Sequence, residues 1–262
     1  MISNFNGYFW LIVIALLFQI GLTLFVLHKV RRIYLASYAI REDAAIARRE
    51  SESLFAQIQA LLALERKLNL AEALPPLRGW AGSPDFLLEI ANEVLDNKPL
   101  TIMECSSGVS TLVIARCLQL NGVGHVYSLE HERVFARKTR DLLGKHALAA
   151  WATVLDAPLQ TVTTGTPWYE ECAIPSDLPL IDMLVIDGPP ASIANLARAP
   201  AVPRLLPRLS KRVVVVIDDA DRNDELEIVE QWRKLLPHLN AEHIACEKGL
   251  VIFRPTPKTT QC

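Results

Sequence analysis

Acidic side chains follow two predicted strands, at positions from which carboxylates can do chemistry. Asp187 ends an apolar run and precedes a Gly-Pro-Pro turn that directs the chain away from a sheet. Asp218 and Asp219 follow a second apolar run, residues 213–217. Adjacent parallel strands lie about 4.8 Å apart, so these carboxylates converge if the two strands are neighbours. Clustered carboxylates repel one another unless they are protonated, hydrogen-bonded or joined by a cation.

Two uses of this cluster are open. In the first, Asp187, Asp218 and Asp219 hold Mg²⁺ or a similar hard divalent cation, which prefers carboxylate and water oxygens. In the second, Asp187 is a metal-free general base, and the aspartate pair caps a turn or a helix. Successive side chains of a strand point to opposite faces, so the pair reaches one ion only if the strand has already ended.

A second group of residues predicts an adenosine-containing cofactor. The small residues of the turn 105–110 let the backbone approach a ligand closely, and a helix is predicted to begin at Val109. About 20 residues further on, a strand ends at Glu130, where a carboxylate can accept hydrogen bonds from both ribose hydroxyls. The turn has one glycine, Gly108, and therefore lacks the G-x-G-x-x-G pattern of dinucleotide-binding proteins.

Read as Glu104-x-Ser106-x-Gly108, the turn resembles motif I of the class I S-adenosylmethionine-dependent methyltransferases. The resemblance extends over about residues 75–255, to a bacterial membrane-anchored branch of that superfamily and to metal-dependent O-methyltransferases. Further segments that carry it are Trp80–Asp85, Ser128–His131, Ala157–Leu159, Trp168-Tyr169, Ile186–Pro190 and Asp218–Arg222. It implies an α/β fold with a Rossmann-like, mostly parallel sheet whose last strand is antiparallel, and it implies S-adenosylmethionine as the cofactor.

The resemblance also implies roles for individual residues. Asp187 is the catalytic residue, and Asp156 with Ala157 falls where the family contacts the adenine ring. Trp168 and Tyr169 form an aromatic wall over the substrate or, alternatively, pack their loop onto the domain. Trp80 and Asp85 close the cofactor pocket or have a packing role. The full set of expected cofactor-binding residues is Glu104, Ser106, Gly108, Ser110, Glu130, His131, Asp156 and Ala157, of which His131 is alternatively a surface residue at a helix start.

The elements that must position these residues are visible as apolar runs between helix-like segments. Their alternation predicts a parallel sheet with helices on both faces and ligands at the carboxyl ends of the strands. A closing hairpin is expected over 241–246 and 250–254. The predicted preceding strands are 100–105, 124–130, 151–156, 180–187 and 212–219.

The N-terminal segment predicts a membrane anchor. Residues 8–27 carry no charged side chain, and 20 residues in a helix span about 30 Å, the thickness of the hydrocarbon core of a bilayer. Lys29, Arg31 and Arg32 follow the segment directly, which predicts a single-pass protein of the inner (cytoplasmic) membrane with its catalytic domain in the cytoplasm.

A long helix is predicted over 31–72, since this segment lacks Gly and Pro. Its apolar residues fall on a heptad-like stripe, which is typical either of a stalk packed on its own domain or of a coiled coil in a homodimer. The expected domains are an anchor (1–30), a stalk (31–74), a methyltransferase domain (75–255) and a tail (256–262).

The composition of the chain disfavours one class of partner. The net charge is −2 and no stripe of Lys and Arg with interleaved aromatics is apparent, which disfavours a nucleic-acid substrate. The five cysteines are scattered and lack metal-ligand spacing, as expected of free thiols in a reducing compartment.

The leading hypothesis is a membrane-anchored O-methyltransferase acting on a glycan, a lipid-linked molecule or another small envelope-related acceptor. The alternatives are an aminopropyltransferase-like enzyme, which requires an acidic amine-binding pocket, and a membrane scaffold with a degenerate methyltransferase fold.

Overall fold

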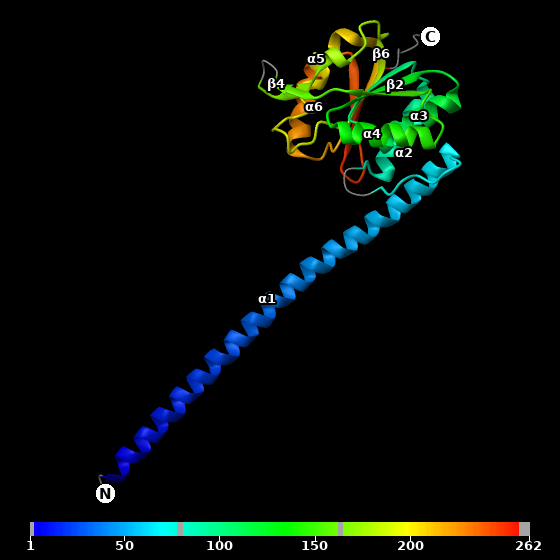
Figure 1. Cartoon of the computed structure of the whole chain (residues 1–262). Helices are drawn as coiled ribbons and strands as arrows, with labels where there is room; N and C mark the ends of the chain where they lie inside the picture. The colour runs from blue at the N-terminus through cyan, green and yellow to red at the C-terminus, as the bar shows by residue number, and fades with distance from the viewer. Residues whose placement is uncertain (1–2, 78–80, 162–164, 257–262) are drawn as a thin grey trace, which may run out of the picture. The chain divides into compact units, whose positions relative to one another are not determined.

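The structure is a computed structural model that describes residues 3–77, 81–161 and 165–256, with side chains described from 16 to 34 and from 53 onward within those ranges (Figure 1). The chain divides into two compact units, residues 1–55 and residues 56–262. Trp80, which the sequence offers as a lid or packing residue, lies outside the described residues.

Helix α1 (Ser3–Leu68) joins the predicted anchor and the predicted stalk into one continuous helix. Large apolar side chains between Leu16 and Leu27 are exposed to solvent. Where side chains are described, however, no helix has a stretch long and apolar enough to cross a membrane. The transmembrane helix predicted over 8–27 is therefore not found there, and its first part, residues 8–15, lies outside the described side chains.

The end of α1 belongs to the second unit, which begins before the predicted domain boundary at residue 75. Ala60, Leu64 and Leu68 are buried at the four-residue spacing of one helix face. Arg116 closes the helix, because its Nε donates to the Leu68 carbonyl at 2.8 Å. Of the predicted stripe, Leu68 packs on the domain, whereas Ile33, Leu54 and Ile58 are exposed, so the buried face differs from the predicted one. Heptad positions 40, 44 and 47 lie outside the described side chains.

The second unit is built on a seven-stranded sheet in the order β3-β2-β1-β6-β7-β9-β8. The first five of these strands pair in parallel, whereas β9 is antiparallel to both of its neighbours. The predicted mostly parallel sheet and its closing hairpin are confirmed. The bounds are β1 (Thr101–Cys105), β2 (His125–Glu130), β3 (Ala152–Asp156), β6 (Ile181–Ile186), β7 (Leu209–Asp218), β8 (Leu239–Ile244) and β9 (Leu250–Pro255).

Two apolar cores cover the two faces of this sheet. Residues of β7 alternate between them: Val214 and Val216 pack in one core, and Val215 and Ile217 pack in the other. The first core contains the end of α1 with α2 (Pro84–Asn97), α3 (Val109–Asn121) and α4 (Arg133–Lys145). The second contains α5 (Ala201–Leu205) and α6 (Asn223–Leu235). Burying each valine or isoleucine contributes about 1.5–3 kcal/mol, which is why continuous apolar runs form these strands.

The connection after β3 is more ordered than the sequence indicates. The segment between the predicted strands 151–156 and 180–187 begins in a small hairpin of β4 (Leu159–Thr161) and β5 (Pro167–Tyr169). Two short 3₁₀ helices, η1 (Glu171–Ala173) and η2 (Leu206–Arg208), complete the described elements. The strand order reverses between β1 and β6, and ligands of open α/β sheets bind at this point, beyond the carboxyl ends of the strands.

Candidate functional site

A cavity of about 390 Å³ opens at the carboxyl ends of β1, β2 and β6. The loop from β1 to α3 forms one wall, with Ser106, Gly108 and Ser110 among the lining residues, as predicted. Ser106 has φ 124°, a value that favours glycine and costs other residues about 1–3 kcal/mol. Serine therefore adopts a glycine-like conformation where the family motif expects a small residue.

Glu104 supports this loop from beneath and does not line the cavity. It is fully buried at the end of β1, and its Oε2 accepts hydrogen bonds from Thr111 at 2.6 Å and from Ser128 at 2.5 Å. Burial raises the pKa of Glu104, and the hydroxyls that bond it, Ser110 included, act in the opposite direction. The expectation that Glu104 borders the cavity is corrected, because the side chain points into the packing between β1, β2 and α3.

Glu130 lies where the sequence predicts a ribose-binding carboxylate. Its side chain lines the cavity, accepts a hydrogen bond from Ser107 Oγ at 2.8 Å and another from the Glu132 backbone N–H at 2.9 Å. His131 Nδ1 lies 3.2 Å from Glu130 Oε1. Burial alone raises the pKa of Glu130, but the hydrogen bonds from His131, Glu132 and Ser107 outweigh it and lower the pKa. Glu130 is thus an ionised acceptor, and His131 lines the cavity beside it.

Asp156 and Ala157 are not among the residues that line the cavity. The Asp156 carboxylate is half exposed and pairs with Arg140 at 3.1 Å. Ala157 is buried, and its N–H donates to the Glu130 carbonyl at 2.8 Å. The predicted contact of these two residues with the adenine ring stays a prediction.

The aromatic pair divides between the two predicted roles. Both side chains are buried in the second core, but Tyr169 also lines the cavity. The two rings remain in edge-to-face contact, with their centroids 5.0 Å apart. The Tyr169 hydroxyl is buried and has no hydrogen-bond partner among the described residues. It is therefore a polar group aimed at a site that a ligand can fill.

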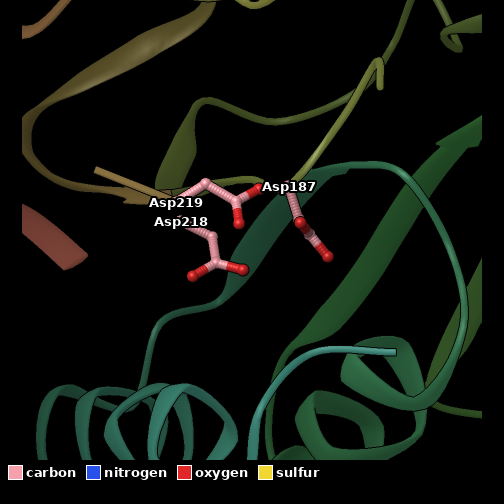
Figure 2. A group of neighbouring side chains, drawn as sticks. All are labelled: Asp187, Asp218 and Asp219. Carbon is pink, nitrogen blue, oxygen red and sulfur yellow. The ribbon is translucent and has the colours of Figure 1, made fainter. Parts of the chain in front are cut away.

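A second cavity, of about 330 Å³, lies at the ends of β6 and β7 and contains the predicted carboxylate cluster. Oxygens of Asp187, Asp218 and Asp219 lie within 4.8 Å of one another (Figure 2). Strand β7 ends at Asp218, and Asp219 has φ 59°, a left-handed conformation that aspartate tolerates better than most residues. Because the strand has ended, both aspartates of the pair reach one cluster.

Buried Arg198, which no sequence motif indicated, is hydrogen-bonded to the ends of both strands. Its Nη2 donates to Asp219 Oδ2 at 2.7 Å and to the Asp187 carbonyl at 2.8 Å, and its Nη1 donates to the Asp218 carbonyl at 2.8 Å. Only 3% of the side chain is exposed. The one sequence signal was an arginine set among small residues, Ala197-Arg198-Ala199-Pro200.

The cluster retains more negative charge than Arg198 neutralises. Burial, together with Asp219 and Glu104, raises the pKa of Asp187 to about 6, although Arg198 and Lys248 act to lower it. Burial, Asp187 and Asp219 raise the pKa of Asp218 to about 8. Asp218 Oδ1 and Asp219 Oδ1 are buried without a partner among the described residues. These free oxygens and this charge fit a divalent cation, although Arg198 and Arg222 already bond Asp219 Oδ2.

The two cavities are adjacent. Asp187, Gly82 and Pro190 line both of them, so the cofactor-side cavity leads to the carboxylate cluster. Asp85 does not close the cavity from the N-terminal side. Its Oδ2 instead accepts hydrogen bonds from Gln57 and from the Glu247 backbone, both at 2.7 Å, and so ties α1 to the turn between β8 and β9.

Residues 105–220 match the family model of a methyltransferase domain. Over this segment the chain is similar to methyltransferase domains. The match begins at the end of β1 and ends just after Asp219, so it contains the loop of the first cavity and the whole carboxylate cluster. A comparison with curated proteins finds no match.

Solved structures share the fold of most of this chain. The SAH-bound methyltransferase PaMTH1 of Podospora anserina is 15% identical, with a TM-score of 0.53, over 75% of this chain and 88% of that one. A candidate O-methyltransferase of Klebsiella pneumoniae is 17% identical, with a TM-score of 0.51, over 76% and 89%. A candidate caffeoyl-CoA O-methyltransferase of Staphylococcus aureus is 15% identical, with a TM-score of 0.50, over 76% and 92%.

Proposed function

We propose that this protein is an S-adenosylmethionine-dependent O-methyltransferase. The observation that carries the proposal is the pair of adjoining cavities, which share Asp187: one has the features of an adenosine site, and the other presents carboxylates to an acceptor. The match of residues 105–220 to a methyltransferase domain supports the reaction class. The similarly folded PaMTH1 is bound to SAH, which supports the cofactor.

The residues of the first cavity fit the cofactor. Glu130, ionised and at the end of β2, accepts the ribose hydroxyls in place of its present bond to Ser107. Ser106 and Gly108 bring backbone close to the methionine portion, and the unpartnered Tyr169 hydroxyl donates to a ligand polar atom. S-adenosylmethionine supplies an activated methyl group on a sulfonium, so the protein has mainly to align the acceptor and exclude water.

Asp187 acts on the acceptor hydroxyl. With a pKa of about 6 it is ionised at neutral pH and can accept the hydroxyl proton. As that proton moves to the Asp187 carboxylate, the acceptor oxygen forms its bond to the methyl carbon and the carbon–sulfur bond breaks, which leaves a neutral thioether. Asp187 lines both cavities, so the base lies at the boundary that the methyl group must cross.

Asp187, Asp218 and Asp219 would hold Mg²⁺ or another divalent cation. When bound, such an ion lowers the pKa of a coordinated hydroxyl and orients it. Methyl-label transfer assayed with and without a chelator tests the metal separately from the reaction. Labelled product that persists in chelator removes the metal and leaves the methyltransferase proposal in place.

The membrane location is a proposal of its own and rests on the uncharged segment 8–27 with its following basic residues. We propose a single-pass inner-membrane protein with a cytoplasmic catalytic domain. Such a location would suit a glycan, a lipid-linked molecule or another small envelope-related acceptor, and α1 would allow a homodimer. Recovery of the full chain in the carbonate-washed membrane fraction supports this location, and release by carbonate contradicts it.

Aminopropyl transfer is less consistent with the second cavity. An amine acceptor requires an acidic pocket, but Arg198, Arg222 and Lys248 line this one alongside the aspartates. Calorimetric titration of the full chain in detergent with S-adenosylmethionine tests the main proposal against a non-catalytic scaffold. Saturable binding and methyl transfer support the enzyme, and no binding at millimolar ligand supports the scaffold.

A further inference from the structure

The second cavity is lined by basic residues as well as by carboxylates. Besides Asp187, Asp218 and Asp219, its lining includes three basic residues. Arg198 already donates hydrogen bonds to the ends of β6 and β7. Arg222, partly exposed at the rim, pairs with Asp219 Oδ2 at 2.9 Å. Lys248 is half-buried and forms no ion pair among the described residues.

Lys248 is near the reacting end of the cavity. Its charge is close enough to Asp187 to act on that carboxylate. A half-buried ammonium group loses part of its hydration, and a buried charge is stabilised when an opposite charge or hydrogen-bond acceptors face it. Within the described residues no acceptor is bonded to this ammonium, so an anion that enters the cavity can supply one.

The backbone holds Lys248 in place before any ligand binds. Its carbonyl accepts the Asp221 N–H at 3.1 Å, and the next carbonyl, of Gly249, accepts the Ala220 N–H at 3.0 Å. A Cβ on Gly249 would lie 2.4 Å from Asp221 Oδ1, so the turn packs closely on the end of β7. Asp85 Oδ2 holds the neighbouring Glu247 N–H at 2.7 Å. The turn is thus fixed by contacts on both sides of Lys248.

We propose that Lys248, with Arg222 at the rim, binds an anionic group of the methyl acceptor, so that the enzyme prefers small hydroxylated acids over neutral analogues. This inference rests on the proposed function and names its substrate class. The acceptor hydroxyl lies at Asp187, and its carboxylate or phosphate lies at Lys248. A cavity of about 330 Å³ accommodates a single-ring acceptor of this kind.

The test compares 3,4-dihydroxybenzoate with its neutral analogue 3,4-dihydroxybenzyl alcohol. The full chain is expected to show a higher kcat/KM for the benzoate, and Lys248→Gln is expected to lower the ratio of the two values roughly tenfold, the effect of one charged hydrogen bond. Lys248→Arg is expected to restore most of the ratio. Lys211→Gln removes the same charge from the exposed amino-terminal part of β7 and is expected to leave the ratio unchanged.

Equal use of both acceptors by the wild type, or an unchanged ratio in Lys248→Gln, overturns the inference. Calorimetry with 3,4-dihydroxybenzoate in the presence of S-adenosylhomocysteine separates it from the proposed function. Binding that weakens in Lys248→Gln without any methyl transfer supports the anion site and counts against the O-methyltransferase. Methyl transfer to neutral acceptors with no benzoate binding supports the O-methyltransferase and contradicts the anion site.

Discussion

The two cavities differ in how far the protein pairs the carboxylates that line them. In the first, the Glu130 carboxylate is bonded by Ser107 and Glu132, and its pKa is lowered. In the second, Asp218 and Asp219 each have a buried oxygen without a partner, and the pKa values of Asp187 and Asp218 are raised. The protein therefore pairs the carboxylate of the cofactor side by itself and leaves the Tyr169 hydroxyl for a ligand, whereas the carboxylates of the acceptor side require a cation or a proton.

This difference follows from the elements that build each side. The first cavity takes its carboxylate from the end of β2, and the donors to it are a hydroxyl of the turn after β1 and the backbone N–H two residues further along the chain. The second takes its charges from the ends of two strands, a long connection and a hairpin turn. Such separate segments bring charges together without supplying backbone donors for all of them.

The largest expected effect is at Asp187, which belongs to both cavities. Asp187→Asn removes the proton acceptor and is expected to lower kcat by about 10²–10⁴-fold, the usual range for a general base, while S-adenosylmethionine affinity changes little. Steady-state kinetics and calorimetry on the same preparation measure the two quantities. Unchanged kcat would show that Asp187 is not the base. An equal loss of affinity would show that the two cavities are not separable.

Removing Arg198 tests how much its positive charge stabilises the carboxylates of the acceptor side. Arg198→Met leaves buried carboxylates uncompensated, and the free energy of unfolding is expected to fall by about 3–5 kcal/mol. Urea denaturation measures it. The matched control is Arg233→Met, which removes an exposed arginine paired with Glu230 at 3.1 Å and is expected to cost less than about 1 kcal/mol. Equal losses in the two variants would contradict a special role for Arg198.

On the cofactor side, Glu130→Ala is expected to weaken S-adenosylmethionine binding by about 1.5–3 kcal/mol, because ribose hydroxyls lose a charged acceptor. Calorimetry measures the change. Asp156→Ala is the control: it removes a carboxylate from the end of the neighbouring strand β3, but one that does not line the cavity, and little change is expected. Similar effects at both positions would place the adenosine moiety elsewhere.

The smallest expected effect is a pH dependence of stability from the acceptor side. Folding raises the pKa of Asp187 from 3.8 to about 6 and that of Asp218 from 3.8 to about 8. The folded protein therefore binds more protons than the unfolded chain. This stabilising contribution is complete below pH 3.8 and is lost as the pH rises through 6 and 8. Melting temperatures of metal-free Asp218→Asn should fall less between pH 6 and pH 8 than those of the wild type. Parallel curves would show that Asp218 titrates normally.

Much of the fold was predictable because its signals are local. The apolar runs marked each long strand to within a few residues, and the Gly-Pro-Pro turn and the aspartate pair marked the ends of β6 and β7. Neighbouring parallel strands end at the same edge, so the convergence of Asp187 with Asp218 followed from the strand order that the resemblance implied. The position of Glu130 could be predicted in the same way, because it is the last residue of β2.

Other features depended on how distant segments pack. Arg198 lies in a connection without periodicity, so no pattern indicated that its side chain would join two strand ends. Trp168 and Tyr169 are adjacent in sequence, and the β4–β5 hairpin packs both into the second core, but Tyr169 also lines the cavity. Asp85 resembled a pocket residue until the fold placed Gln57 and Glu247 against it.

The sequence by itself determined where the strands run and which carboxylates stand at their ends, because periodicity and turn chemistry act over a few residues. Only the tertiary structure decided which of those carboxylates face a cavity, which are neutralised by Arg198 and which face Lys248. Charge interactions depend on distance and burial, and both are set by segments far apart in the chain.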